Sequence, residues 1–342
     1  VSESVMIDLL VAGAGPAGLA TAIHAARAGL QVTVVERRSG PIDKACGEGL
    51  MPHTLRHLDA LGITPHGKPF RGITYLDSTR RVEARFPGPA GRGVRRTVLS
   101  EALHSAAASA GVSIIKGDIG DIEQDANSVR CSGLEARYLA AADGLHSPIR
   151  RQLGLDRPVR GGRRWGIRRH FQIAPWSDTV EVYWAAHTEA YVTPVSDDCV
   201  GVAILTSRQG KFDDHLGEFP LLAAHLAGAE GGPARAAGPL RQRAASQHSG
   251  RVMLVGDAAG YVDALTGEGL GIALGCAELV VNAILADDPA DYTRQWRRMS
   301  RRYRMLTAAL LTASKSPARP MIVPAAATMP GVFNQAVKLL AQ

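Results

Sequence analysis

The stretch "IDLLVAGAGPAGLATAIHAARAG", residues 7–29, decides the fold of this 342-residue chain. The apolar run at residues 5–12 is typical of a buried parallel strand, and a glycine-rich turn then leads into a helical pattern. Gly13, Gly15 and Gly18 have the spacing G-x-G-x-x-G. In such a turn the first glycine permits the tight bend, the second lets backbone approach a pyrophosphate, and the third allows the helix to pack closely on the strand.

A second strand and its terminal acid complete this unit. The segment "QVTVVE", residues 31–36, has strand character, and Glu36 ends it about twenty residues after the glycines, where a carboxylate can accept both ribose hydroxyls of a dinucleotide. Pro16 and Ala17 open the helix, whose unpaired amides and positive dipole end would face the phosphates. We therefore expect nucleotide binding here, with Arg37 beside Glu36.

A later stretch, residues 250–285, indicates which nucleotide to expect. A predicted strand at 252–255 is followed by an acid, a glycine-bearing loop and a long helix. This order suits an acid that binds the hydroxyls of a ribityl chain, followed by amides that reach the pyrimidine edge of a flavin, where the helix dipole favours negative charge. The residues expected to contact FAD in this stretch are Gly256, Asp257, Gly267, Glu268 and Gly269.

Together with "AADGLHSPIR", residues 141–150, these motifs resemble the FAD-dependent superfamily of group A flavin monooxygenases, geranylgeranyl reductases and flavin-dependent halogenases. The resemblance covers residues 5–285. It implies that Asp143 and Gly144 lie by the pyrophosphate. It also implies that Arg96, in "RRTVLSEAL", contacts FAD, although Arg95 is a neighbour that could be confused with it.

The resemblance also implies an α/β fold. We expect a Rossmann-like FAD-binding domain of the glutathione-reductase type, an inserted antiparallel β-sheet substrate domain and a C-terminal helical tail. A hairpin at 71–86 and four strands within 168–205 alternate with period two, as half-buried strands do. The predicted boundaries are 1–69, 88–158 and 245–288 for the FAD-binding domain, 70–87 and 159–244 for the substrate domain, and 289–342 for the helical segment, with a last short helix at about 331–340.

The predicted sheet carries the candidates for substrate contact. On the strand "EAYVTPV", the alternate residues Glu189, Tyr191 and Thr193 share one face. Only Tyr191 and Pro194 match the aromatic patterns Y-x-W-x-F-P of the reductases and W-x-W-x-I-P of the halogenases, so the halogenase hypothesis weakens most. The substrate-pocket candidates are Arg168, His170, Trp184, Tyr191 and Thr193.

The loop "DKACGEGLMP", residues 43–52, resembles the K-P-C-G-G-G segment of the geranylgeranyl reductases. We expect Lys44, Cys46 and Gly47 at the cofactor, because glycine lets backbone pass close to a flavin. Cys46 is either a small residue lining the flavin pocket or a reactive thiol whose pKa is lowered by adjacent amides and Lys44. No residue is a compelling catalyst; the weak candidates are Cys46, Tyr191 and His170.

The composition indicates which classes of protein and partner to expect. With 46% hydrophobic and 21% charged residues and no apolar run of about 18, we expect a soluble, cytoplasmic protein. The net charge of +7 is spread along the chain without a nucleic-acid motif, so nucleic acid is not an expected partner. Neither the four separated cysteines nor the pair His53 and His57 forms a metal-ligand set. An apolar stripe within 292–310 predicts a helix that packs on the domain rather than on a membrane surface.

Three functions remain open, and the first two use FAD as a redox cofactor. The first is a monooxygenase in which NAD(P)H, docking transiently, reduces FAD and O2 forms a C4a-hydroperoxyflavin that hydroxylates or epoxidises a small organic substrate, apolar or aromatic, in biosynthesis. The second is a reductase of C=C bonds, like the geranylgeranyl reductases. The third is an FAD-binding scaffold for non-redox chemistry. We expect a monomer or a homodimer.

Overall fold

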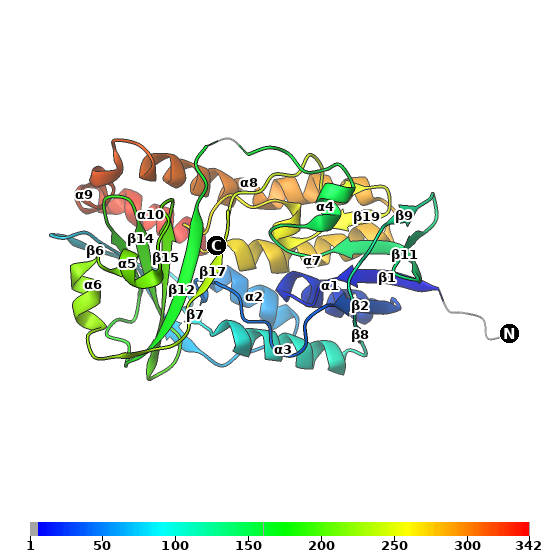
Figure 1. Cartoon of the computed structure of the whole chain (residues 1–342), viewed down its shortest axis with the longest axis horizontal. Coiled ribbons are helices and arrows are strands. Elements are labelled where there is room, and N and C mark those ends of the chain that lie inside the picture. Colours follow the sequence, from blue (N-terminus) through cyan, green and yellow to red (C-terminus); the bar gives the residue numbers. More distant parts are fainter. Residues whose placement is uncertain (1–5, 160, 342) are drawn as a thin grey trace.

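Two large β-sheets lie toward opposite ends of the long axis of the molecule (Figure 1). The computed structural model describes residues 6–159 and 161–341, so residues 1–5, 160 and 342 of the predicted domains lie outside the described chain. Helices pack beside the first sheet, and the C-terminal helices run from it toward the second (Figure 1).

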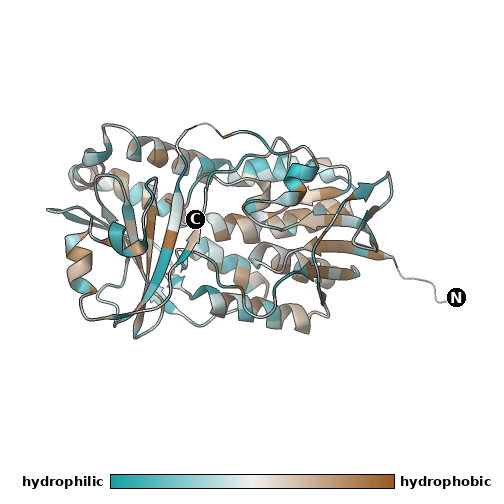
Figure 2. Cartoon of the chain, in the orientation of Figure 1, coloured by the Kyte–Doolittle hydropathy of each residue, from teal (hydrophilic) through white to brown (hydrophobic). Residues whose placement is uncertain are grey.

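The first sheet is the predicted nucleotide-binding sheet. Its strand order is β18 (His248–Ser249), β19 (Val252–Leu254), β11 (Leu134–Ala141), β1 (Ile7–Ala12), β2 (Val32–Glu36) and β8 (Ser113–Lys116). The strands β19, β11, β1, β2 and β8 pair in parallel, and a hairpin of β9 (Glu123–Gln124) and β10 (Val129–Cys131) joins β11 antiparallel. Strands buried on both faces are apolar throughout. Figure 2 shows this along the strands of the first sheet.

Helices cover this sheet and begin close to its strands. The helix α1 (Pro16–Arg27) packs against α3 (Arg96–Ser109) and α7 (Gly269–Leu285). At the turn before α1, Gly13 has φ +103°, and a Cβ on Gly18 would lie 1.9 Å from the Gly13 carbonyl oxygen. The close packing that the sequence predicts for the first and third glycines is therefore a steric requirement here.

The second sheet contains the predicted hairpin and the four predicted strands. Its order is β16 (Glu230–Gly231), β12 (Trp165–Gln172), β15 (Cys199–Thr206), β14 (Glu189–Pro194), β13 (Val180–Trp184), β5 (Gly72–Leu76) and β6 (Arg81–Arg85), with β17 (Arg235–Ala237) also on β12. One pairing differs from the antiparallel prediction, because β13 and β5 run parallel. The chain passes through the first sheet between these two strands, so no tight turn connects them.

A third, small sheet was not predicted. It joins β3 (Gly49–Leu50), β7 (Gly91–Gly93) and β4 (Lys68–Phe70). A Cβ on Gly93 would lie 1.8 Å from the carbonyl oxygen of Pro194, so β7 passes directly against β14. Shorter helices complete the described chain: α2 (Pro52–Ala60), α4 (Pro148–Gln152), α5 (Phe212–Leu216), α6 (Pro220–His225) and the 3-10 turn η1 (Gly256–Ala259).

The C-terminal segment is helical. The helix α8 (Pro289–Ser314) buries Tyr292 and Trp296 and exposes arginines, as the apolar stripe predicts. The turn η2 (Arg319–Met321), α9 (Ile322–Thr328) and α10 (Pro330–Ala341) follow. The helix α9 was not predicted. Its Pro324 lies in the first turn, where an amide has no intrahelical acceptor to lose. Among the described helices, none is both long and apolar enough to cross a bilayer.

Candidate functional site

A cavity lies between the loops after the first-sheet strands and one face of the second sheet. Loops after β1, β2, β11 and β19 contribute Gly15, Lys44, Gly144 and Asp257 to its lining. Open α/β sheets bind ligands outside the carboxyl ends of their strands, so this is where a nucleotide would be expected. The predicted cofactor residues that line the cavity are Gly15, Pro16, Ala17, Lys44, Cys46, Gly47, Arg96, Gly144, Asp257, Gly267 and Gly269.

Seven predicted cofactor residues lie outside this lining: Gly13, Gly18, Glu36, Arg37, Asp143, Gly256 and Glu268. Two glycines among them, Gly13 and Gly18, shape the turn described above. Gly256 has φ +62°, and a Cβ on it would lie 2.8 Å from that of Ala17. Arg37 is exposed.

Two of these acids hold the backbone around the cavity. Glu36 accepts a hydrogen bond from the amide of Ala14 at 2.9 Å. Burial would raise the pKa of Glu36, but hydrogen bonds from Ala14 and Arg38 outweigh it and lower that pKa. Asp143 accepts hydrogen bonds from the Ser147 hydroxyl at 2.8 Å and the Ile149 amide at 3.1 Å. Asp143 thus fixes the turn into α4, next to the cavity-lining Gly144.

Arg96 and Lys44 supply positive charge to the cavity. Arg96 is 6% exposed, and its Nη1 has no hydrogen-bond partner among the described residues. The Lys44 ammonium lies 3.3 Å from the position that a Cβ on Gly144 would take. No described carboxylate forms an ion pair with either side chain. Both cations are therefore available to an anionic group in the cavity.

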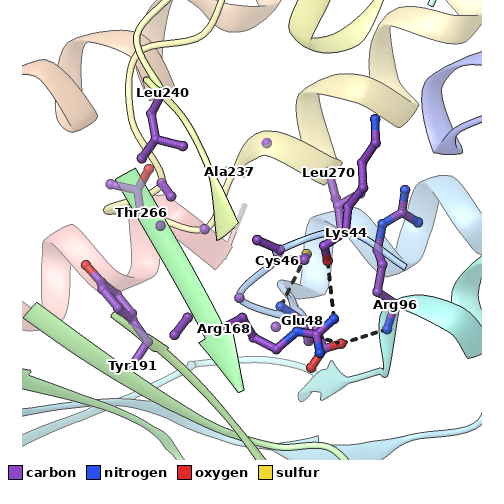
Figure 3. Close-up of a pocket in the computed structure, with 18 of the residues that line it drawn as sticks. Lys44, Cys46, Glu48, Arg96, Arg168, Tyr191, Ala237, Leu240, Thr266 and Leu270 are labelled. Atoms are coloured by element: carbon purple, nitrogen blue, oxygen red, sulfur yellow. Dashed lines mark hydrogen bonds and ion pairs between the residues drawn. The ribbon is translucent and has the colours of Figure 1, made fainter. Parts of the chain in front are cut away.

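The loop from Asp43 to Gly49 carries Cys46 and Glu48 into the same space (Figure 3). The Glu48 amide donates to the Cys46 sulfur at 3.4 Å. Burial raises the pKa of the Cys46 thiol, and the Arg96 charge opposes this only in part. Of the two alternatives for Cys46, the thiol with a lowered pKa is contradicted, because burial and Glu48 outweigh the neighbouring cations and amides.

Glu48 is held by both domains, which the sequence did not predict. It is 2% exposed and has φ +60°, a conformation that favours glycine. Its Oε1 accepts the Arg96 amide at 2.8 Å, and its Oε2 lies 2.6 Å from His170 Nε2. Arg168 lies 3.0 Å from His170 Nδ1. Because a guanidinium can only donate, Nδ1 accepts and Nε2 carries the proton donated to Glu48.

The predicted substrate residues thus divide into two groups. Arg168 and Thr193 line the cavity but also hold the loop: Arg168 pairs with Asp43, and the Thr193 hydroxyl donates to the Gly47 carbonyl at 2.8 Å. Tyr191 lines the cavity and donates to the Leu265 carbonyl at 3.0 Å. His170 and Trp184 do not line the cavity.

His170 and Trp184 have other partners. His170 binds Glu48, as described above. Trp184 is 8% exposed and packs edge-on against Tyr75, with ring centroids 5.4 Å apart, while the Arg319 guanidinium lies 5.4 Å from the Trp184 ring centroid. The sequence analysis missed much of the apolar lining: the second sheet contributes Ile73, Tyr75, Val180, Val182 and Leu205, the third sheet contributes Phe70, and the loop after β17 contributes Leu240.

The family model described as "FAD binding domain" matches residues 6–284. The chain belongs to this FAD-binding family. Two relatives match over most of their length. A menaquinone reductase of Mycobacterium tuberculosis is 27% identical, over 84% of this chain and 78% of the relative. Digeranylgeranylglycerophospholipid reductase 1 of Methanopyrus kandleri is 29% identical, over 82% of each chain.

A hydroxylase relative matches a smaller part of the chain, and a solved monooxygenase shares its fold. A 3-(3-hydroxy-phenyl)propionate/3-hydroxycinnamic acid hydroxylase of Mycobacterium sp. (strain JLS) is 31% identical, over 44% of this chain and 30% of the relative. The crystal structure of p-nitrophenol 4-monooxygenase PnpA from Pseudomonas putida DLL-E4 superposes with a TM-score of 0.81 at 21% identity, covering 98% of this chain and 95% of that one. The family contains both reductases and monooxygenases, and this chain is an FAD-dependent oxidoreductase.

The cavity of this family member fits FAD by its own chemistry. A Cβ on Gly15 or Gly267 would meet no atom within 4 Å, so their backbone faces open space. Arg96 brings an unpartnered buried guanidinium for a phosphate, and the Asp257 carboxyl suits ribityl hydroxyls. The amides at the start of α7 face the cavity at Gly269 and would meet the pyrimidine edge of the ring.

Proposed function

We propose that this chain is an FAD-dependent reductase that saturates a C=C bond in an apolar substrate. Both relatives described above as matching over most of their length are named reductases. Bound FAD, reduced transiently by NAD(P)H, would supply a hydride to one carbon of the double bond. The chain must then supply a proton to the other carbon.

Cys46 carries this proposal. Its thiol lines the cavity on a loop beside the expected flavin position, and its raised pKa keeps the thiol protonated at neutral pH. A protonated group at this place can donate a proton as hydride arrives. The resulting thiolate would lie near the positive charge of Arg96, which favours its formation during the reaction.

The second sheet supports the apolar substrate class. Its residues Ile73, Val180, Val182 and Leu205 line this side of the cavity, and Phe70 of the small third sheet adds to them. Such a surface binds hydrocarbon and excludes water from the reacting atoms. We therefore expect a substrate with an unsaturated hydrocarbon portion.

An anaerobic half-reaction tests the proposed reductase. The purified holoprotein is reduced with one equivalent of dithionite and mixed, without O2, with a prenylated quinone or a free polyprenyl compound. We expect oxidised-flavin absorbance to return and the saturated product to appear by mass spectrometry. A flavin that stays reduced with every unsaturated substrate until O2 is admitted contradicts the proposal.

The monooxygenase is the second candidate. The hydroxylase relative of 31% identity, which matches less than half of this chain, favours it, and a cavity that excludes water would protect an oxygenating flavin. Hydroxylation or epoxidation would consume one O2 for each NAD(P)H oxidised in the presence of substrate. Substrate-dependent oxygen uptake with an oxygenated product would select this function. If bound flavin reacts with neither class of substrate, the FAD-binding scaffold for non-redox chemistry is the function that remains.

A further inference from the structure

His53 and Glu268 form a buried pair behind the loop that leads into α7. His53 Nε2 lies 2.9 Å from Glu268 Oε2, and the side chains are 4% and 3% exposed. Glu268 immediately precedes Gly269, the first residue of α7, and both neighbours of Glu268, Gly267 and Gly269, line the cavity. A carboxyl group is thus buried within one residue of the amides expected to face the flavin ring.

The contacts of His53 leave one site, between its Nε2 and the Glu268 carboxyl, where this pair can hold an exchangeable proton. His53 Nδ1 lies 3.1 Å from the carbonyl oxygen of Leu340, which can only accept, so Nδ1 carries a hydrogen. The second ring nitrogen, Nε2, faces Glu268 and Thr54. One proton between Nε2 and the carboxyl gives either an imidazolium with a carboxylate or two neutral groups. In both cases the net charge of the pair is zero.

The surroundings favour keeping that proton. Burial raises the pKa of Glu268, and His53 opposes this rise. Ionisable groups around the pair include Tyr303 on α8, which stacks on His53 with ring centroids 5.3 Å apart, Arg302 on α8, and Arg56 and His57 on α2. The Arg302 guanidinium is bonded to the Leu339 carbonyl, and its charge also lowers the pKa of Glu268. His53 is the ionisable side chain in direct contact with the Glu268 carboxyl, so it can neutralise that group by sharing a proton.

An unneutralised Glu268 would act against a reduced flavin. The amides at the N-terminus of α7 stabilise negative charge on the ring, which increases when the flavin is reduced. A carboxylate one residue away would repel the same charge across a poorly solvated space. The loss of the shared proton would therefore favour oxidised over reduced FAD.

We propose that His53 and Glu268 are positioning residues that hold one proton behind the N-terminus of α7, so that this helix end favours the reduced form of bound FAD. The proposal depends on FAD binding alone, which the reductase and the monooxygenase share. The C-terminal helix α10 takes part, because its Leu340 carbonyl fixes which nitrogen of His53 faces Glu268.

The midpoint potential of bound FAD tests this proposal without any substrate. In His53→Gln the amide keeps a hydrogen-bonding group but cannot hold a positive charge. We expect the affinity for reduced FAD relative to oxidised FAD to fall at least tenfold at pH 8, which is about 30 mV for a two-electron couple. The loss should shrink as the pH is lowered, because Glu268, whose pKa is raised by burial, then takes the proton itself.

The double variant His53→Gln/Glu268→Gln should return to the wild-type potential, because no carboxylate remains. His57→Gln, one turn along α2, is the matched control and should leave the potential unchanged. Apoprotein unfolding and FAD affinity are measured for each variant; if His53→Gln does not bind FAD, His53→Asn replaces it. An unchanged potential in His53→Gln, or a loss that the double variant does not reverse, would overturn the proposal. Neither result bears on the anaerobic test of reductase activity.

Discussion

Arg96 places a buried guanidinium at the cavity from the first turn of α3. Arg96→Ala removes a charge-assisted hydrogen bond that we expect to an FAD phosphate. Such a bond typically contributes about 1.5–3 kcal/mol of free energy. We expect FAD affinity to fall about 10- to 100-fold, as measured by flavin fluorescence on titration of the apoprotein. Arg95→Ala is the control, because Arg95 is exposed. Equal losses from both variants would show that general charge, rather than this guanidinium, binds the cofactor.

Cys46 is expected to act after the cofactor is bound. Cys46→Ala removes the proton donor of the proposed reductase but leaves the backbone of the loop in place. Since general acids contribute about 10²- to 10⁴-fold, anaerobic substrate reduction should fall by at least 100-fold with FAD affinity unchanged. Stopped-flow measurement of flavin reoxidation checks this. If Cys46→Ala turns over at the full rate, the thiol serves only in packing and is not the proton donor.

Single residues were predictable where the reason is local. Gly13 and Gly18 follow from the tight turn, and Asp257 from the end of a strand. The contacts of Glu48 were not predictable, because its partner His170 is 122 residues away. The K-P-C-G-G-G pattern has glycine where this chain has Glu48, and the φ of +60° at Glu48 is a conformation that favours glycine.

At the scale of elements, β12 is connected to the Cys46 loop through His170, Arg168 and Glu48. His170→Ala leaves a buried carboxylate without its closest hydrogen-bond donor, and a hydrogen bond to a charged group contributes about 1.5–3 kcal/mol. We expect the free energy of unfolding to fall by about that amount in denaturant titrations.

The double variant Glu48→Gly/His170→Ala tests whether the loss in His170→Ala comes from the charge of Glu48. It removes the unpaired charge and relieves the left-handed backbone, which costs about 1–2 kcal/mol for a residue other than glycine. The double variant should therefore be more stable than His170→Ala alone. If it is less stable, the pair contributes through packing rather than through charge.

The elements themselves were largely predictable from periodicity and glycine spacing. The strand β1, the helix α7 and the hairpin at 71–86 all lie where the patterns place them. The parallel pairing of β13 with β5 was not predictable, because it depends on the path of the intervening chain rather than on either strand. The helix α9 was not predicted; it forms around Pro324 because this proline lies in the first turn, where its missing amide breaks no intrahelical hydrogen bond.

At the scale of the whole molecule, buried acids around the cavity make stability depend on pH. Burial raises the pKa of Asp257, although Lys44, Arg96 and Arg150 oppose this. Because folded Asp257 holds its proton more tightly than the unfolded chain does, its stabilising contribution is complete below about pH 4 and is lost as pH rises through the raised folded pKa.

Asp257→Asn should abolish that contribution. We expect the unfolding free energy of the wild-type apoprotein to fall relative to the variant as the pH rises from 4 to 7, because the folded pKa of Asp257 is raised. Glu36→Gln gives the opposite sign, because the folded pKa of Glu36 is lowered and its contribution is lost as pH falls. Denaturant titrations across this range measure both effects. A wild-type to Asp257→Asn difference that is constant with pH would contradict the prediction.

The course of the C-terminal helix has a practical consequence for handling this protein. Leu340 lines the cavity and Ala341 is buried beside it, whereas the described chain starts at the far end of the molecule (Figure 1). An affinity tag or fluorescent fusion joined after residue 342 would leave the fold next to the flavin. Fusions are better joined at the N-terminus, and any flavin titration made with a C-terminal tag should be repeated after its removal.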